Sequence, residues 1–205
     1  MVLAPIHRQY GIKRVVVSTY QAASGAGGSG QQELFEHTKC VANGEDVPAP
    51  GEFSRELAFN AIPQIDVFLP EENNYTKEEM KMVWETRKIL GDQLIKVSPT
   101  AVRIPVLNCH GESVNIETHS SCEPEEVKEL LAASDGVELM DAPESGQFPT
   151  MLDADGKDDT YVGRIRRDPS LEHGLNCWIV ADNLRKGAAL NTIQIAETLI
   201  ERELL

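Results

Sequence analysis

The sequence predicts an α+β domain. Segments rich in β-branched residues are mixed with amphipathic stretches, without the regular strand–helix alternation of a parallel doubly wound sheet. The 205 residues are enough for one large domain or two small ones, and 41% of them are hydrophobic, which suffices for a sizeable core. Together with an average charged fraction of 25%, this composition argues against a disordered or collagen-like chain.

The expected elements follow from apolar spacing and from turn residues. Thr76 and Glu79 fit a capping box that begins a helix, and Gly91 ends it. Helices are expected at 2–10, 31–42, 77–90, from about 124, and at 183–203. Strands are expected at 13–20, 101–107, 113–118, 137–140, 161–166 and 175–181. Residues 43–56, with two prolines and two glycines, are expected to form an exposed loop.

Charge and composition exclude several classes of function. The chain has 19 Lys and Arg against 33 Asp and Glu, a net charge of −14, which repels nucleic acid and anionic membranes. No apolar run approaches the ~20 residues that span a bilayer, and residues 1–6 are too short for a signal peptide, so a cytoplasmic protein is expected. The four cysteines lack metal-site spacing, which predicts free thiols and no bound metal.

A glycine-rich turn matches the dinucleotide-binding fingerprint but not its surroundings. Gly25, Gly27 and Gly30 follow an expected strand and precede an expected helix. The second strand and its acidic end, ~20 residues on, are absent, which argues against a Rossmann site. The turn is either a flexible connection or a place where backbone approaches a polar ligand.

Two further groups of polar residues have both a structural and a chemical interpretation. His110 lies in an expected turn seven residues after Arg103, where it is either a surface residue or a proton-transfer group beside an anion-binding arginine. Adjacent Cys109 makes a poor thiolate–imidazole pair, because neighbours point apart in extended chain. On the capped helix, four residues share one face, either as a solvated charge stripe or as ligands for ammonium and phosphate: Glu78, Lys81, Glu85 and Lys88.

Several segments form a recognisable set, in order, along almost the whole chain. They are Ser-Thr-Tyr-Gln-Ala-Ala-Ser-Gly-Ala-Gly at 18–27, Phe-Asn-Ala-Ile-Pro-Gln-Ile-Asp at 59–66, Glu-Thr-Arg-Lys-Ile-Leu at 85–90, Val-Arg-Ile-Pro-Val at 102–106 with Cys-His at 109–110, Gly-Arg-Ile-Arg-Arg-Asp at 163–168, and Ala-Asp-Asn-Leu-Arg-Lys-Gly-Ala-Ala at 181–189. The set resembles the aspartate-semialdehyde dehydrogenase family, specifically its C-terminal catalytic and dimerisation domain. The resemblance implies a mixed or antiparallel sheet with helices packed on one face, as in the C-terminal domain of glyceraldehyde-3-phosphate dehydrogenase.

The resemblance also implies an activity. It is the NADP-dependent interconversion of L-4-aspartyl phosphate and L-aspartate 4-semialdehyde plus phosphate, on the route to lysine or diaminopimelate, threonine and methionine. By resemblance, His110 is the acid/base catalyst, Arg103 binds the substrate α-carboxylate, and Gln21 orients the substrate near a thioester.

The remaining site residues are implied in the same way. Glu85 matches the partner of the substrate amino group and Lys88 the phosphate-binding lysine, while Ser24, Gly25 and Asn183 match contacts to NADP. A substrate with a phosphate, a carboxylate and an ammonium group needs a cation, a bidentate cation and an anion to bind these groups. Lys88, Arg103 and Glu85 supply this set.

One feature of the family is missing from the sequence. The family's nucleophile is a cysteine in an Asn-Cys-Ser/Thr segment, and none of the four cysteines has that context. The resemblance places that cysteine and an NADP-binding domain before Met1. The chain alone is therefore expected to be catalytically inactive and to bind NADP weakly or not at all. Residues 1–10 and 184–205 would then expose apolar faces or bury them in an oligomer.

The expected partners are a second copy of the chain, the N-terminal NADP-binding domain, the small-molecule substrate and phosphate. Two other interpretations stay open. One is a non-catalytic dimerisation or interaction module derived from the family. The other is N-acetyl-glutamyl-phosphate reductase, whose acylated amine has no use for the carboxylate of Glu85.

Overall fold

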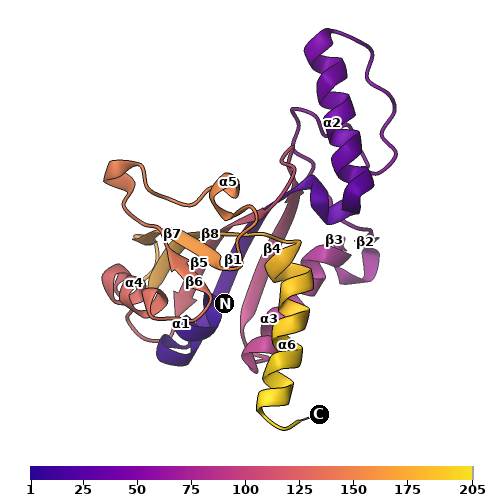
Figure 1. Cartoon of the computed structure of the whole chain (residues 1–205). Helices are drawn as coiled ribbons and strands as arrows, with labels where there is room; N and C mark the ends of the chain where they lie inside the picture. Colours follow the sequence, from indigo (N-terminus) through magenta and orange to yellow (C-terminus); the bar gives the residue numbers. More distant parts are fainter. Residues whose placement is uncertain (205) are drawn as a thin grey trace.

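A six-stranded mixed sheet forms the centre of the computed structural model, which describes residues 1–204 (Figure 1). The strands, in spatial order, are β4 (Lys96–Arg103), β1 (Ile12–Gln21), β5 (His110–Thr118), β8 (Gly174–Ala181), β7 (Thr160–Arg167) and β6 (Val137–Leu139). The β4–β1 and β7–β6 pairs are parallel, and the other pairs are antiparallel. The expected α+β class with a mixed sheet is therefore confirmed.

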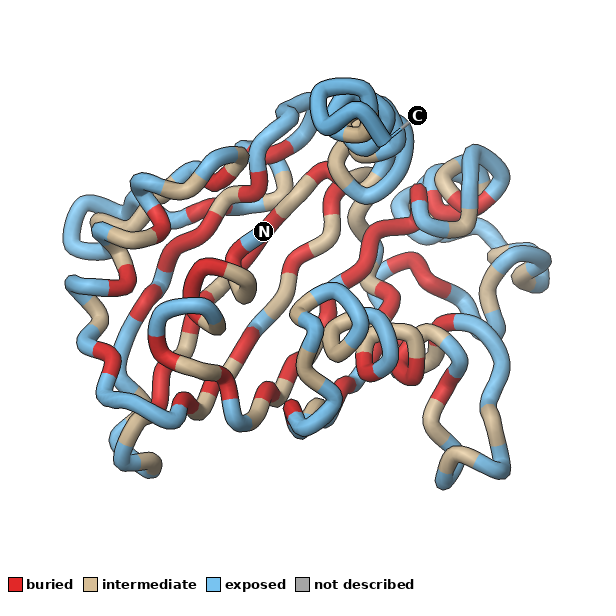
Figure 2. The backbone as a smooth tube through the Cα atoms, turned by 90° about the horizontal axis from the view of Figure 1, so that it is seen from below, coloured by how far each residue is buried: buried red, intermediate tan, exposed pale blue. Residues whose placement is uncertain are grey.

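Three helices cover one face of this sheet and build the main core. They are α1 (Leu3–Tyr10), α3 (Lys77–Leu90) and α4 (Pro124–Ala132). Their apolar residues join the inward side chains of the strands in a single buried cluster. Figure 2 shows buried residues recurring along the strands and exposed residues on the outer loops. These three helices thus pack on one face, as expected, whereas the short helix at Met151–Ala154 packs against Trp178 on the other face.

Helix α1 differs from the expectation of an unpartnered apolar face. Val2, Ile6 and Tyr10 recur every four residues and all belong to the main core, with Ile6 only 1% exposed. The expectation was wrong because this spacing gives α1 a narrow apolar stripe that fits the strands of the same chain.

The C-terminal helix is placed differently. A π-helical turn at Arg185–Ala189 leads into α6 (Leu190–Glu201), which has no buried residue. Ile193, Ile195 and Ile200 are each more than half exposed. Figure 1 shows α6 as a separate helix near the C-terminus, outside the layer of strands.

An arm projects from the sheet on the side of β1 (Figure 1). A short 3-10 turn at Ala23–Ala26 leads from β1 into α2 (Gly27–Asn43), and residues 44–60 return beside this helix. The base of the arm has its own small core, made by residues from the turn, the helix and the returning segment: Ala23, Leu34, Phe53, Leu57, Ala58 and Ile62.

The remaining differences concern boundaries and short elements. Strand β4 begins at Lys96 and ends at Arg103, before Pro105, and His110 begins β5 rather than lying in a turn. The short strands β2 (Phe68–Leu69) and β3 (Tyr75–Thr76), and the single-turn helix α5 (Met151–Ala154), have too few residues for a periodic pattern. No helix within residues 1–204 is both long and apolar enough to cross a membrane.

Candidate functional site

Three of the expected site residues lie side by side at one edge of the sheet. Gln21 is the last residue of β1, Arg103 the last of β4, and His110 the first of β5. In the strand register, Gln21 is the partner of Arg103 on one side and of His110 on the other. Partners in register lie on the same face of the sheet, so the three side chains form one row.

The backbone of Ala22 holds the two outer members of this row. Its N–H donates to Nδ1 of His110 at 3.1 Å, and its carbonyl accepts a hydrogen bond from the guanidinium of Arg103. Ala22 is fully buried and Arg103 is 6% exposed. Arg103 also lies over the ring of Phe53, 5.9 Å from its centre, which links the row to the arm.

Helix α3 brings two more charged residues to the same place. The expected capping box is present, with the Thr76 N–H donating to Glu79 at 2.7 Å. The other carboxylate oxygen of Glu79 accepts the N–H of Ala101 on β4, which ties the start of α3 to the end of β4. The first turns of α3 therefore place Glu78 and Lys81 beside the row.

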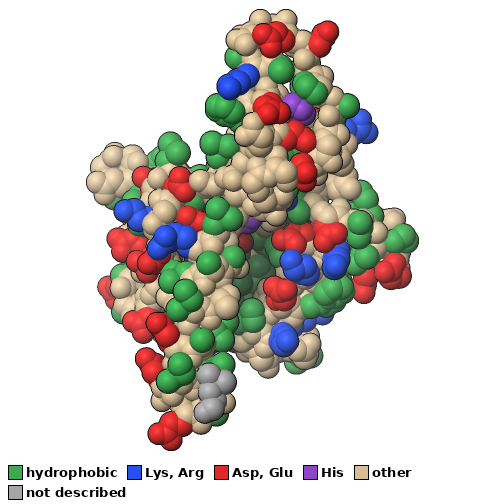
Figure 3. Space-filling view, turned by 45° about the vertical axis from the view of Figure 1, so that its right-hand side comes forward, with side chains coloured by type: hydrophobic (Ala, Val, Ile, Leu, Met, Phe, Trp, Pro, Cys, Tyr) green, Lys and Arg blue, Asp and Glu red, His purple; other side chains and the backbone are tan. Residues whose placement is uncertain are grey.

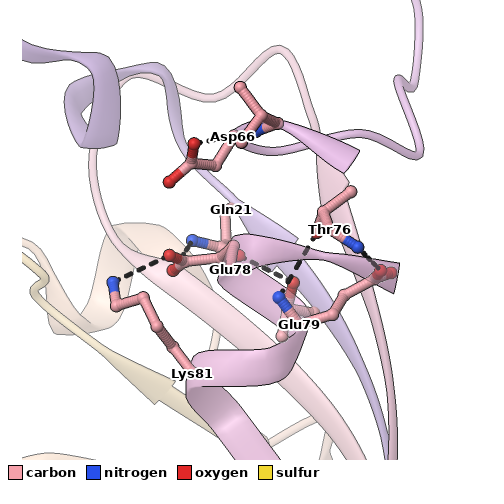
Figure 4. A network of polar contacts seen from close by, with 8 residues as sticks. Gln21, Asp66, Thr76, Glu78, Glu79 and Lys81 are labelled. Atoms are coloured by element: carbon pink, nitrogen blue, oxygen red, sulfur yellow. Dashed lines mark hydrogen bonds and ion pairs between the residues drawn. The ribbon is translucent and has the colours of Figure 1, made fainter. Parts of the chain in front are cut away.

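Glu78 is at the centre of a polar network (Figure 4). One of its carboxylate oxygens accepts the side-chain amide of Gln21 at 3.3 Å, and the other pairs with Nζ of Lys81 at 2.9 Å. Asp66 lies above this network in the same view, with φ of +68°, a conformation that few residues other than glycine adopt.

These residues line one cavity of about 620 Å³. Its wall carries two cations, three carboxylates, the imidazole of His110 and the backbone of Gly25. Figure 3 shows acidic and basic side chains side by side at a hollow beneath the arm. The charged lining residues are Arg103, Lys81, Glu52, Asp66 and Glu78. The arm contributes Glu52, Phe53 and Ser54, so the segment expected to be an exposed loop forms the outer wall.

The structure does not bring Glu85 or Lys88 to this cavity. Both share the face of α3 that carries Glu78, but Glu85 lies seven residues further along, which is about 10 Å of helix, and Lys88 lies about 15 Å away. Both are exposed, and Glu85 lines a different cavity. The four residues share a helix face as expected, and of these the structure places Glu78 and Lys81 at this cavity.

Burial and charge set the protonation of the site. The pKa of His110 is lowered to about 4, mainly by burial and also by the Arg103 guanidinium, against a backbone hydrogen bond to Cys109 that raises it. The hydrogen bond to Glu78 raises the pKa of Lys81, so this amine is charged at neutral pH. Arg103 keeps its charge although burial lowers the pKa of its guanidinium. The cavity thus holds two fixed cations and a neutral histidine.

The residues expected to contact NADP also lie together. Oδ1 of Asn183 accepts hydrogen bonds from Ser24 Oγ at 3.0 Å and from the N–H of Cys109 at 3.1 Å. No described residue accepts a hydrogen bond from the Asn183 amide nitrogen, which leaves it free to donate. Asn183 and His110 line a second, largely apolar cavity of about 400 Å³, so His110 separates two cavities.

One cluster has metal-ligating residue types but not the character of a metal site. Cys109, Asp155 and Asp182 bring one potential ligand atom each within 4.8 Å of one another. Both oxygens of Asp182 already accept backbone N–H groups, from Gly156 and from the start of the C-terminal helical segment. Burial raises the pKa of Cys109 to about 12, which keeps the thiol protonated and unsuited to metal binding.

Residues 3–186 match the family model described as semialdehyde dehydrogenase, dimerisation domain. The aspartate-semialdehyde dehydrogenase of Aquifex aeolicus is 50% identical over 203 residues, which cover 99% of this chain and 59% of that protein. The crystal structure of aspartate semialdehyde dehydrogenase II from Vibrio cholerae, complexed with ASA, is 49% identical with a TM-score of 0.93, covering 98% of this chain and 58% of that chain.

A more distant structure shares the fold. The aspartate semialdehyde dehydrogenase with NADP from Candida albicans is 24% identical with a TM-score of 0.71, covering 100% of this chain and 55% of that one. The chain therefore spans less than two thirds of the length of the relatives it matches.

Proposed function

Since the chain belongs to the semialdehyde dehydrogenase dimerisation-domain family, we propose that it carries the substrate-recognition groups of an NADP-dependent aspartate-semialdehyde dehydrogenase. The reaction is the interconversion of L-4-aspartyl phosphate and L-aspartate 4-semialdehyde plus phosphate, in the biosynthesis of lysine or diaminopimelate, threonine and methionine. The observation that carries the proposal is the convergence of Arg103, Glu78 and Lys81 on one cavity with His110.

The cavity supplies one protein group for each charged part of the substrate. Arg103 is a bidentate donor suited to the α-carboxylate, and Glu78 is the anion suited to the ammonium group. Lys81 is a compact cation suited to phosphate. In this assignment Glu78 and Lys81 take the roles expected for Glu85 and Lys88, because only the former pair reaches Arg103. A substrate with an acylated amine, as in N-acetyl-glutamyl-phosphate reductase, gives Glu78 nothing to bind.

Asn183, Ser24 and Gly25 fit a contact to the nicotinamide end of NADP, because a free amide donor and open backbone suit its carboxamide. The cofactor supplies or accepts a hydride when bound. Gln21 holds Glu78 in place and lies next to His110, where it orients the reacting end of the substrate.

The nucleophile is proposed to come from outside this chain, together with most of the NADP-binding surface. Within residues 1–204, no cysteine lines the cavity, and Cys109, Cys122 and Cys177 are buried. The chain would then combine with an NADP-binding domain, and the exposed apolar residues of α6 support such a contact.

Calorimetry with L-aspartate semialdehyde and with inorganic phosphate tests the assignment. Glu78→Gln should weaken semialdehyde binding at least tenfold, and Lys81→Met should weaken phosphate binding by a similar factor. The matched controls Glu85→Gln and Lys88→Met, on the same helix face, should leave both affinities unchanged. Loss of binding in the control pair instead would overturn the assignment.

Turnover tests the origin of the nucleophile separately. The purified chain, mixed with L-aspartate semialdehyde, phosphate and NADP, is expected to produce no NADPH. Steady NADPH formation would show that a thiol of this chain acts as the nucleophile.

We also propose a homodimer formed through the face of the sheet opposite α1, α3 and α4, in accord with the matched dimerisation domain. The outward residues of the central strands include Tyr20 and Trp178, whose rings meet edge-on with centres 5.3 Å apart, and exposed Ser113. Tyrosine and tryptophan side chains are enriched at protein interfaces.

A further inference from the structure

A buried threonine lies directly behind the row of site residues. Thr19 and Gln21 are two residues apart on β1, so their side chains lie on the same face of the sheet. In register, Thr19 is the partner of Ala101 on β4 and of Glu112 on β5. Thr19 is 2% exposed and is not among the residues that line the main cavity. It can therefore affect a ligand there only through its neighbours.

The hydroxyl of Thr19 takes part in two hydrogen bonds. The N–H of Val102 on β4 donates to Oγ1 at 3.3 Å, and a backbone N–H can only donate. The single hydroxyl proton is then available to Oε1 of Gln21, which lies 3.0 Å from Oγ1. A carbonyl oxygen only accepts, so this contact directs Oε1 of Gln21 toward Thr19 and Nε2 away from it.

The carboxylate of Glu78 supports this orientation from the other side. Nε2 of Gln21 donates to Oε1 of Glu78 at 3.3 Å. In the reversed amide, two oxygens would oppose each other at this contact, and the proton of Thr19 would lose its acceptor. Nε2 carries two N–H groups, and within residues 1–204 only Glu78 accepts a hydrogen bond from it. Since Gln21 lines the cavity, the second N–H is available to a ligand there.

We propose that Thr19 is a positioning residue, whose hydroxyl holds the side-chain amide of Gln21 so that Nε2 donates a hydrogen bond to an oxygen of the bound substrate. This inference rests on the proposed function and specifies how Gln21 orients the substrate. The oxygen belongs to the reacting aldehyde or acyl group, because Gln21 lies in register between Arg103, assigned to the α-carboxylate, and His110.

The contribution of Thr19 becomes larger once the substrate is bound. In the free site, the carboxylate of Glu78 favours the same orientation of the Gln21 amide. In the proposed complex, Glu78 also accepts hydrogen bonds from the substrate ammonium group and from Lys81, which are stronger donors than a neutral amide. The hydroxyl of Thr19 is buried behind the cavity and meets no such competition. It therefore keeps the amide oriented when the bond to Glu78 weakens.

The residue type at position 19 also points to the site. Val15 and Val17 precede Thr19 on the same face of β1 and belong to the main core. Valine at position 19 would have almost the same shape and would continue this apolar row. A buried hydroxyl costs free energy unless it forms hydrogen bonds, and one of the two bonds of Thr19 leads to Gln21. The hydroxyl thus supports a polar residue of the site.

Proton NMR of the free chain tests the orientation of the amide. The Nε2 protons of Gln21 are identified by the signals that disappear in Gln21→Met. We expect stronger nuclear Overhauser effects from these protons to the Hγ protons of Glu78 than to the methyl group of Thr19. The reverse order would overturn the proposal. Because no ligand is present, failure of semialdehyde to bind in calorimetry counts only against the proposed function.

A double-mutant cycle tests whether Thr19 acts through Gln21. Thr19→Val keeps the shape of the side chain and should weaken L-aspartate semialdehyde binding about fivefold, as for the loss of one hydrogen bond. Thr19→Ser keeps the hydroxyl and should restore most of the affinity. In Gln21→Met, the added Thr19→Val should change the affinity less than twofold. No loss from Thr19→Val alone, or an equal loss in both backgrounds, would overturn the proposal.

Thr118→Val is the matched control. Thr118 is 3% exposed, at the end of β5 opposite His110, and its hydroxyl donates to the carbonyl of Ser120 at 2.7 Å. The control removes a buried, hydrogen-bonded hydroxyl from the same sheet, far from the cavity. It should leave the affinity for L-aspartate semialdehyde unchanged. A loss as large as that in Thr19→Val would show that the effect comes from the sheet and not from the amide of Gln21.

Discussion

A Cβ atom added to Gly25 would lie only 2.6 Å from the guanidinium of Arg103. Gly25 has an ordinary φ, so its backbone does not require glycine. What the position requires is space, because Arg103 and His110 both pack against the bare Cα. The glycine turn that resembles a dinucleotide fingerprint therefore leaves room for the Arg103 side chain of the neighbouring strand β4.

The substitution Gly25→Ala should displace the Arg103 guanidinium and weaken L-aspartate semialdehyde binding at least tenfold. The expected loss of folding stability is about 1–3 kcal/mol, as for other overpacked sites. Gly28→Ala is the matched control, since nothing lies within 4 Å of an added Cβ there and its φ is ordinary. The control should leave the binding constant unchanged. It should raise folding stability by up to about 1 kcal/mol, because alanine favours the helical conformation of α2 more than glycine does. Calorimetry and urea unfolding of both variants make the comparison.

The protonation of His110 predicts a dependence of stability on pH. The pKa of His110 in the folded chain, about 4, lies below the ordinary value of 6.5, so the unfolded chain binds a proton first as the pH falls. This contribution is fully present above pH 6.5 and is lost between pH 6.5 and 4, by at most about 3 kcal/mol. Carboxylates affect the wild type and His110→Gln alike, so the wild type should lose more stability over this window. Equal losses in the two proteins would show that the fold does not disfavour the imidazolium.

The resemblance named Gln21, Arg103 and His110 as site residues, whereas the sequence pattern ended the first strand before Gln21 and put His110 in a turn. Their adjacency depends on strand register, which the structure provides. The sequence-based prediction assigned substrate binding to Glu85 and Lys88 and not to Glu78 and Lys81, because helical spacing specifies a face and not a height along the axis. The wall formed by Glu52 and its neighbours was not predicted either. That segment has no periodicity, and its position depends on hydrogen bonds to α2 that are distant in sequence.

The face of the sheet opposite α1, α3 and α4, which α5 and its loop cover near Trp178, predicts an interface that one charge can break. Ser113 lies exposed in β5, in register between Ser18 of β1 and Trp178 of β8. Ser113→Arg should shift the protein from dimer to monomer in sedimentation at micromolar concentration, because it places a long charged side chain at the centre of the face. Thr198→Arg, on exposed α6, should leave the sedimentation of the chain unchanged. A dimer that survives Ser113→Arg would place the interface elsewhere.

One side chain of α2 ties the returning segment of the arm to this helix. Oε2 of Glu33, on α2, accepts the N–H groups of Gly51 and Glu52, each at 2.8 Å. These bonds precede the three residues that wall the cavity, including Phe53 above Arg103. Substitution of Glu33 should therefore loosen residues 52–54 of the arm. The sheet residues Gln21, Arg103 and His110 should keep their positions.

In Glu33→Ala we expect the amides of Gly51 and Glu52 to exchange hydrogen at least tenfold faster, because each loses a charge-assisted bond. Affinity for L-aspartate semialdehyde should fall several-fold as the wall opens, while protection of the β1 and β5 amides stays unchanged. Glu36→Ala, one turn along α2, removes only an exposed contact to Gln32 and should alter neither measurement. Faster exchange with an unchanged affinity would mean that the arm covers the cavity without contributing to binding.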